Sequence, residues 1–236
     1  MTIFAFGGMN LLRRNSYAAL PALKFSIGLL VFAFLLFNIE RQVHFMFENL
    51  LVKAEVLAQQ VFLTREWVTD YGGVWVSRDT PPYHRVENNM YLKTPAMVTG
   101  ELARYADKYG RFAFGLASRN PLNPDNTPDA LELEAISRLE QGERLFTRLV
   151  LRPTTQFHYV VPLHTDERCL ECHYQQGYAE GDLAGVLSVT IPAGTMLQQL
   201  YVVTATNVVF ALVTFALATL LASDWVKKSF YCRWQT

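Results

Sequence analysis

The sequence predicts an α+β domain carried between two transmembrane helices. Two apolar segments predict the helices, and the rest of this 236-residue chain has the composition of an ordinary soluble domain. Within that rest, helical segments lead into a run of strands, an order typical of an antiparallel sheet with helices packed on it. The formal net charge is zero. The composition therefore offers no basic field for nucleic acid, and we expect no nucleic-acid partner.

The first apolar segment, Phe25–Ile39, is short for a bilayer core of roughly 30 Å at about 1.5 Å per residue. Extension back to Ala18 gives a span over 18–39, in which Lys24 reaches the headgroups. A buried core helix and a cleaved signal peptide are the alternatives. No small-residue cleavage site follows the segment, so we expect an uncleaved anchor.

The second span, 201–222, contains no charged residue and has the length that a membrane helix needs. Basic residues flank both spans on the side of the chain ends, which are the tails 1–17 and 223–236. These basic residues are Arg13, Arg14 and Lys24 within the segment 1–24, and Lys227, Lys228 and Arg233 against Asp224 after the second span. The intervening segment, 40–200, holds the other 15 basic and 20 acidic residues. The positive-inside rule then predicts cytoplasmic termini in a bacterial inner membrane, with 40–200 in the periplasm.

Cys169-Leu170-Glu171-Cys172-His173 matches the C-x-x-C-H signature of haem c attachment. On a helical turn, positions i, i+3 and i+4 share one face. Two thiols on that face can bond to the vinyl groups along one porphyrin edge, and the histidine that follows can reach the iron as the proximal ligand. We expect one covalent haem c, attached through Cys169 and Cys172 and ligated by His173.

Other uses of this cysteine pair have less support. A structural zinc site needs four ligands, and the remaining cysteine, Cys232, lies beyond the second span. A thioredoxin-like pair opens a helix after a buried strand, whereas the segment before Cys169 is polar. A structural disulfide between Cys169 and Cys172 stays as the main alternative. The predicted location agrees with haem c, because covalent haem attachment takes place outside the bacterial cytoplasm.

Capping residues, glycines and hydrophobic periodicity divide the segment 40–200 into helices, strands and one long loop. The expected helices are 41–69, 94–108 and 130–141, the expected strands are 74–76, 111–119, 145–152, 156–163 and 185–191, and the loop is 79–89. The last strand alternates apolar and polar positions, as a strand with one buried face does.

The long helix over 41–69 carries an apolar stripe at alternating steps of four and three, with Thr64 at its one polar step. The stripe consists of Val43, Phe47, Leu50, Ala54, Leu57, Val61 and Val68. Such a stripe either packs on its own domain or forms a helix–helix seam in an oligomer. The lipid bilayer is one expected partner, and the stripe predicts a homo-oligomer or a subunit of a larger membrane assembly.

Several motifs in addition to the C-x-x-C-H segment mark a known family. They are Arg65-Glu66-Trp67, Gly72-Gly73-Val74-Trp75-Val76, Tyr91-Leu92, Thr94-Pro95-Ala96, Arg119-Asn120-Pro121, Asn123-Pro124, Pro128-Asp129 and Gly181-Asp182 through Gly185 to Pro192. Over roughly 55–192, the chain resembles the haem-c-binding, PAS-like sensor family that was long catalogued as a domain of unknown function and has soluble relatives in cyanobacteria. The resemblance implies a PAS-like antiparallel sheet with flanking helices. The chain departs from the family at Met90, where a proline is usual.

The resemblance also implies that the distal iron ligand comes from the helix ahead of Arg119-Asn120-Pro121, where a soluble relative uses a cysteine. This chain has no such cysteine, so Met97 is the preferred candidate. The alternatives are an open or water-bound iron and the side chains of Met90, His44, His84, His158 and His164. Arg65 and Arg111 are candidates for contacts with the haem propionates.

The sequence is compatible with two functions. The first is a membrane-anchored, periplasmic mono-haem c-type cytochrome that acts in electron transfer or as a redox-poised haem subunit. The second is a haem-based redox or gas sensor that signals to a separate partner, since only 14 residues follow the second span. An enzyme such as a peroxidase needs an open iron and a distal acid–base group. The sequence contains no motif that identifies a distal acid–base group, so we do not expect an enzyme.

Overall fold

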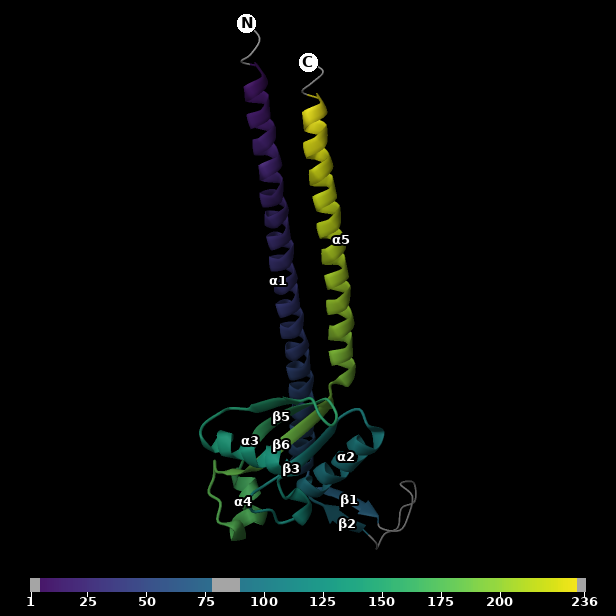
Figure 1. Ribbon diagram of the computed structural model, residues 1–236. Helices are drawn as coiled ribbons and strands as arrows, with labels where there is room; N and C mark the ends of the chain where they lie inside the picture. Colours follow the sequence, from purple (N-terminus) through teal and green to yellow (C-terminus); the bar gives the residue numbers. More distant parts are fainter. Residues whose placement is uncertain (1–4, 78–89, 233–236) are drawn as a thin grey trace. The chain divides into compact units, whose positions relative to one another are not determined.

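The computed structural model describes the backbone of residues 5–77 and 90–232 (Figure 1). The chain divides into two units. The first, 1–46 with 196–236, holds most of two long helices, α1 (Ala5–Asp70) and α5 (Gly194–Cys232). The second unit, Phe47–Thr195, contains the end of α1 and all the strands, and is called the sheet domain below.

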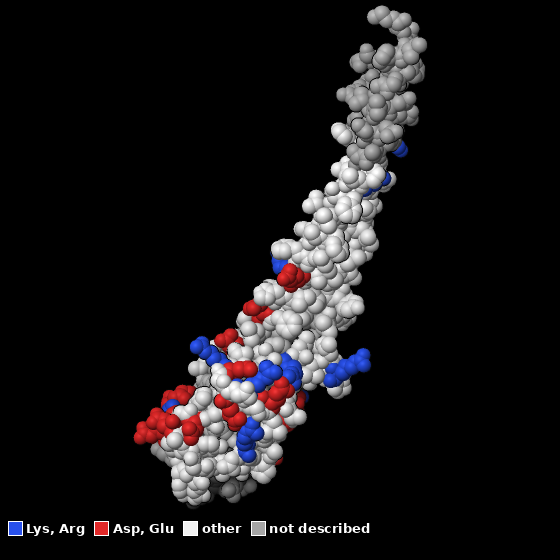
Figure 2. All heavy atoms as spheres, turned by 60° about the vertical axis from the view of Figure 1, so that its left-hand side comes forward, with Lys and Arg blue, Asp and Glu red and all other residues white. Residues whose placement is uncertain are grey.

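The helical unit is apolar over long stretches. By length and composition, two helices are long enough and apolar enough to cross a membrane, within Leu20–Asp70 and Gly194–Lys228. In the view of Figure 2, few charged side chains appear on the described surface of this unit. The two helices approach each other at Gly28, where an added Cβ would lie 3.2 Å from the Phe215 ring. These features agree with the two predicted spans.

The sheet domain contains a four-stranded antiparallel sheet in the order β3-β6-β5-β4 and a separate antiparallel hairpin of β1 and β2. This arrangement confirms the predicted α+β class. The strands are β1 (Val74–Ser77), β2 (Met90–Lys93), β3 (Ala113–Ala117), β4 (Phe146–Val150), β5 (Gln156–His164) and β6 (Leu183–Pro192). The helices that join them are α2 (Pro95–Tyr109), α3 (Ala130–Glu140) and α4 (Glu167–His173), with 3₁₀ turns at Pro124–Asn126 and Tyr174–Gln176.

The capping residues read from the sequence mark the true helix ends. The Thr94 side chain accepts a hydrogen bond from the Met97 backbone at the start of α2. Gly110 ends α2 in the left-handed conformation at φ 68°, which glycine adopts without a steric penalty. At α3, Asp129 and Glu132 form a reciprocal capping box with N–O distances of 2.8 and 3.1 Å.

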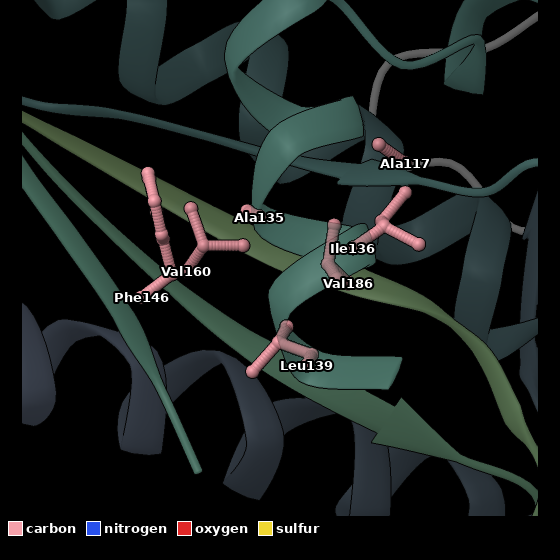
Figure 3. Packing of buried hydrophobic residues seen from close by; sticks show 7 residues of the cluster. All are labelled: Ala117, Ala135, Ile136, Leu139, Phe146, Val160 and Val186. Carbon is pink, nitrogen blue, oxygen red and sulfur yellow. The ribbon is translucent and has the colours of Figure 1, made fainter. Parts of the chain in front are cut away.

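One face of the sheet packs against α3. Ala135, Ile136 and Leu139 of this helix point toward the strands (Figure 3). Their partners on β3 to β6 are Ala117, Phe146, Val160 and Val186, all buried. This cluster is the hydrophobic core on that side of the sheet.

The other face of the sheet is buried as well. β6 was expected to have one buried face, yet Val186, Leu187, Ser188 and Val189 are consecutive buried residues. Glu55 of α1 lies near Tyr159 on this second face, where burial first and the Glu55 charge second raise the pKa of the phenol. A central strand covered on both faces loses the expected alternation, because both sets of side chains are removed from water.

The part of the apolar stripe of α1 from Leu50 to Val68 packs within the sheet domain, while Phe47 is 40% exposed. Leu50, Ala54, Val61 and Val68 are all buried in the single chain. Of the two uses considered for this stripe, packing on its own domain is therefore the one that the structure shows. The oligomer itself stays a prediction, and any seam on α1 in this domain needs other residues.

The sequence patterns did not predict two elements near the site. Strand β2 has four residues, the shortest length over which a period of two can be recognised. The 3₁₀ turn Tyr174–Gln176 has no distinctive sequence signature. The loop predicted over 79–89 and the candidate ligand His84 lie outside the described residues.

Candidate functional site

A cavity of about 760 Å³ opens in the sheet domain. Its walls come from α1, the start of α2, the ends of β3 and β5, the start of β6, the loop after β3, and α4. Phe62, Leu116, Pro162 and Ala184 supply apolar surface, while charged and polar groups lie at a few points. This volume is in the range of about 300–1,000 Å³ that is usual for cofactor and small-molecule sites.

The C-x-x-C-H segment forms one wall of this cavity. It lies on α4, the helical turn that its spacing predicts, and both Cys169 and His173 line the cavity. Asp166 caps α4 by accepting a hydrogen bond from the Cys169 backbone at 2.8 Å. The side chain of Cys172, which lies on the same short helix, is outside the described part of the structure. The sequence and the fold therefore bring a thiol and an imidazole, one turn apart, to one cavity wall.

A chain of hydrogen bonds fixes the orientation of the His173 ring. The Gln176 side-chain amide donates to the backbone carbonyl of Asn120, which can only accept. The oxygen of the same amide therefore faces the Nδ1 atom of His173 and accepts a hydrogen bond from the Nδ1–H group. With the proton on Nδ1, the Nε2 lone pair is free to bind a metal, as in most metal-binding histidines. The sequence did not predict these two partners, because the 3₁₀ turn after α4 brings Gln176 to His173, and only the fold brings the Asn120 carbonyl to Gln176.

The structure separates the two candidate arginines. Arg65 lines the cavity, and its guanidinium donates to the Thr99 hydroxyl at 3.3 Å. Among the described residues it forms no ion pair with a carboxylate, and burial lowers its pKa while the nearby Cys169 acts in the opposite direction. Arg111 is not among the residues that line the cavity. Of the two candidate arginines, Arg65 is therefore the one placed to meet an anionic group inside the cavity.

Arg168 ties the C-x-x-C-H helix to α1. Its guanidinium lies 2.8 Å from Glu66, 3.3 Å from Asp70 and 2.8 Å from Asp166. The hydrogen bonds from Cys169 and then Arg168 lower the pKa of Asp166 to about 2, and contacts with Glu66 and then Asp166 raise the pKa of Arg168. Each exposed pair contributes little alone, but a network of four charges is a more effective link.

Only some of the described candidates for the distal ligand line the cavity. Met97 follows Ala96, a lining residue, but the Met97 side chain is 49% exposed and does not line the cavity. His158 does not line the cavity and is hydrogen-bonded to Thr190 at 3.1 Å. His164 lines the cavity, with its Nδ1 atom 3.0 Å from the Gly181 carbonyl. His44 and Met90 are also absent from the lining.

The fold and the site define an α+β domain with a Cys-x-x-Cys-His helix on the wall of an apolar cavity, in a chain with two long apolar helices. A family model described as Tll0287-like matches residues 41–192, and the chain belongs to this family. Among solved structures, the crystal structure of the cyanobacterial haem-protein Tll0287 is similar, at 18% sequence identity and a TM-score of 0.45, covering 61% of this chain and 95% of that one. No curated protein matches the sequence.

Proposed function

We propose that this protein is a membrane-anchored, mono-haem c-type cytochrome that acts in electron transfer or as a redox-poised haem subunit. The observation that carries the proposal is the presence of Cys169 and His173 on one wall of the cavity. Membership in a family named for a protein described as a haem-protein supports it. The PAS-like fold, the two membrane spans and the periplasmic location of the sheet domain belong to the same proposal.

The residues of the cavity fit a haem. Cys169 and Cys172 would carry the thioether bonds, and Nε2 of His173 would ligate the iron, because Gln176 holds the proton on Nδ1. Arg65 supplies a cation with no protein carboxylate against it among the described residues, which suits a propionate. Bound haem would supply a one-electron redox centre. The residues named above would hold and orient it, and the apolar lining of the cavity would exclude water from it.

The distal ligand stays open between several groups. Met97 remains the ligand that the resemblance favours, although its side chain does not line the cavity. His164 is the described histidine, other than His173, that lines the cavity. Methionine raises the reduction potential and a second histidine lowers it. The choice between them therefore decides which redox partners the protein can serve.

The sensor function is a second candidate, and the Arg168 contacts favour it. Arg168 precedes Cys169 directly and contacts Glu66 and Asp70 of α1. A movement of α4 on a change of iron state would thus act on α1 through these ion pairs. Hydrogen exchange of α1 amides in the oxidised and reduced protein separates the two candidates. A sensor should show a difference that Arg168→Gln abolishes, whereas an electron carrier should show none.

Covalent haem attachment has a direct test. Protein made in a host with a c-type cytochrome maturation system should keep haem-peroxidase staining after denaturing electrophoresis. The double variant Cys169→Ala, Cys172→Ala should lose the stain, and Cys232→Ala, the matched control, should keep it. Staining that survives in the double variant, or wild-type protein without stain, would refute covalent attachment.

A further inference from the structure

The part of α1 in the sheet domain carries a second apolar stripe, on the face opposite the buried one. Val52, Val56, Leu63 and Trp67 are 53%, 58%, 64% and 57% exposed. Their steps of four, seven and four residues return to one side of a helix. We call these four residues the outer stripe. A row of large apolar side chains in water marks an interaction surface more often than a bare monomer surface.

We propose that the outer stripe packs against the outer stripe of a second copy of this chain, forming a parallel α1–α1 pair. The spacing supports a helix as the occupant. Val52 and Leu63, and likewise Val56 and Trp67, are 11 residues apart. An 11-residue repeat corresponds to about 3.67 residues per turn, close to the 3.6 of a straight helix. An identical helix can therefore follow the stripe over its whole length with little supercoiling.

The charges beside the stripe favour a second copy in the parallel sense. Lys53 and Gln60 lie along one flank of the stripe, and Glu55 and Glu66 lie along the other. In a parallel pair each flank faces the opposite flank of its partner, so Lys53 faces Glu55 of the second copy at nearly the same height. In an antiparallel pair each flank faces its own kind, and the glutamates of the two copies meet.

This occupant fits better than a lipid surface. Helices that lie on a membrane carry lysine and arginine along the polar face beside the apolar stripe. Here one flank of the outer stripe is acidic. The parallel sense also follows from the membrane anchoring in the proposed function, because copies inserted in the same way point their α1 helices in the same direction. The stripe and its flanking charges stand without that anchoring.

The pairing surface is continuous with the candidate haem site. Leu63 belongs to the outer stripe and also lines the cavity, as does the neighbouring Phe62. Glu66, one residue before Trp67, pairs with Arg168 of the C-x-x-C-H helix. A second α1 on the outer stripe would therefore cover the cavity rim at Leu63. It would bring the haem sites of the two copies to opposite sides of a single helix pair.

Cysteine cross-linking of the full chain in membranes tests this contact. Cys232→Ser serves as the background, with Cys169 and Cys172 retained for haem. Val56→Cys or Leu63→Cys is then introduced, and Leu133→Cys on α3, also an exposed leucine, is the matched control. Mild oxidation should convert the two stripe variants to a disulfide-linked dimer and leave the background and the control monomeric. In native mass spectrometry, Val56→Glu should shift the protein from dimer to monomer.

The outcomes separate this inference from the proposed function. Haem staining without cross-linking at position 56 or 63 would overturn the pairing and leave the haem proposal intact. Cross-linking without haem staining would support the pairing of the outer stripes and overturn the haem proposal. A monomer that co-purifies with a different protein would also overturn the pairing if Val56→Glu released that protein. The outer stripe would then bind another partner. If Leu133→Cys cross-linked as much as the two stripe variants, the disulfides would reflect random collision, and the pairing would likewise be rejected.

Discussion

Replacing Arg65 by methionine measures two effects of this cation on the free energy of unfolding. One is the effect of burying its charge, and the other is the effect of its proposed contact with the haem. Methionine keeps an unbranched side chain and removes the charge together with the 3.3 Å hydrogen bond to Thr99. In the haem-free variant (Cys169→Ala, Cys172→Ala), loss of that bond costs about 0.5–1.5 kcal/mol. Relief from burying an unpaired guanidinium offsets this loss. The free energy of unfolding should therefore change by less than about 1 kcal/mol.

With haem attached, the same substitution should also remove the proposed contact between Arg65 and a propionate. Hydrogen bonds to charged groups contribute about 1.5–3 kcal/mol, which is roughly a 10- to 150-fold change in the unfolding equilibrium constant. Denaturant unfolding of the detergent-solubilised chain, followed by tryptophan fluorescence, measures both backgrounds. Arg111→Met should change either background by less than about 0.5 kcal/mol. Equal effects of Arg65→Met with and without haem would refute the propionate assignment.

Two further predictions concern the α3 side of the sheet. Asp129→Ala removes the capping box with Glu132 and should lower the free energy of unfolding by about 1 kcal/mol; a change below about 0.3 kcal/mol would contradict the cap. Burial, the largest cause, lowers the pKa of His158, which is hydrogen-bonded to Thr190. The unfolded chain then binds a proton that the folded chain resists, so this contribution is present above about pH 6.5 and is lost as the pH falls below it. His158→Gln should flatten the stability curve below that pH in denaturant titrations, and an unchanged slope would refute the assignment.

The sequence alone determined the features that depend on local chemistry. A C-x-x-C-H segment needs only its own spacing to predict a helical turn with thiol and imidazole on one face. Thr94, Asp129 and Gly110 marked the helix ends because caps act on backbone groups within one turn. One uncharged segment, 201–222, and one apolar segment extended past Lys24, 18–39, were enough to predict the two apolar helices. In each case the physical cause lies within a few consecutive residues, so no knowledge of distant contacts was required.

The tertiary structure decided everything that depends on residues far apart in the sequence. Arg65 and Arg111 are alike as sequence, and only the packing of α1 beside the cavity distinguishes them. The two apolar stripes of α1 follow similar helical spacings, yet one is buried by the sheet domain and the other remains exposed. Gln176 reaches His173 and Asn120 only through the folded chain. Periodicity shows that a helix face is apolar, but the distribution of neighbours in space decides whether the same chain or another covers it.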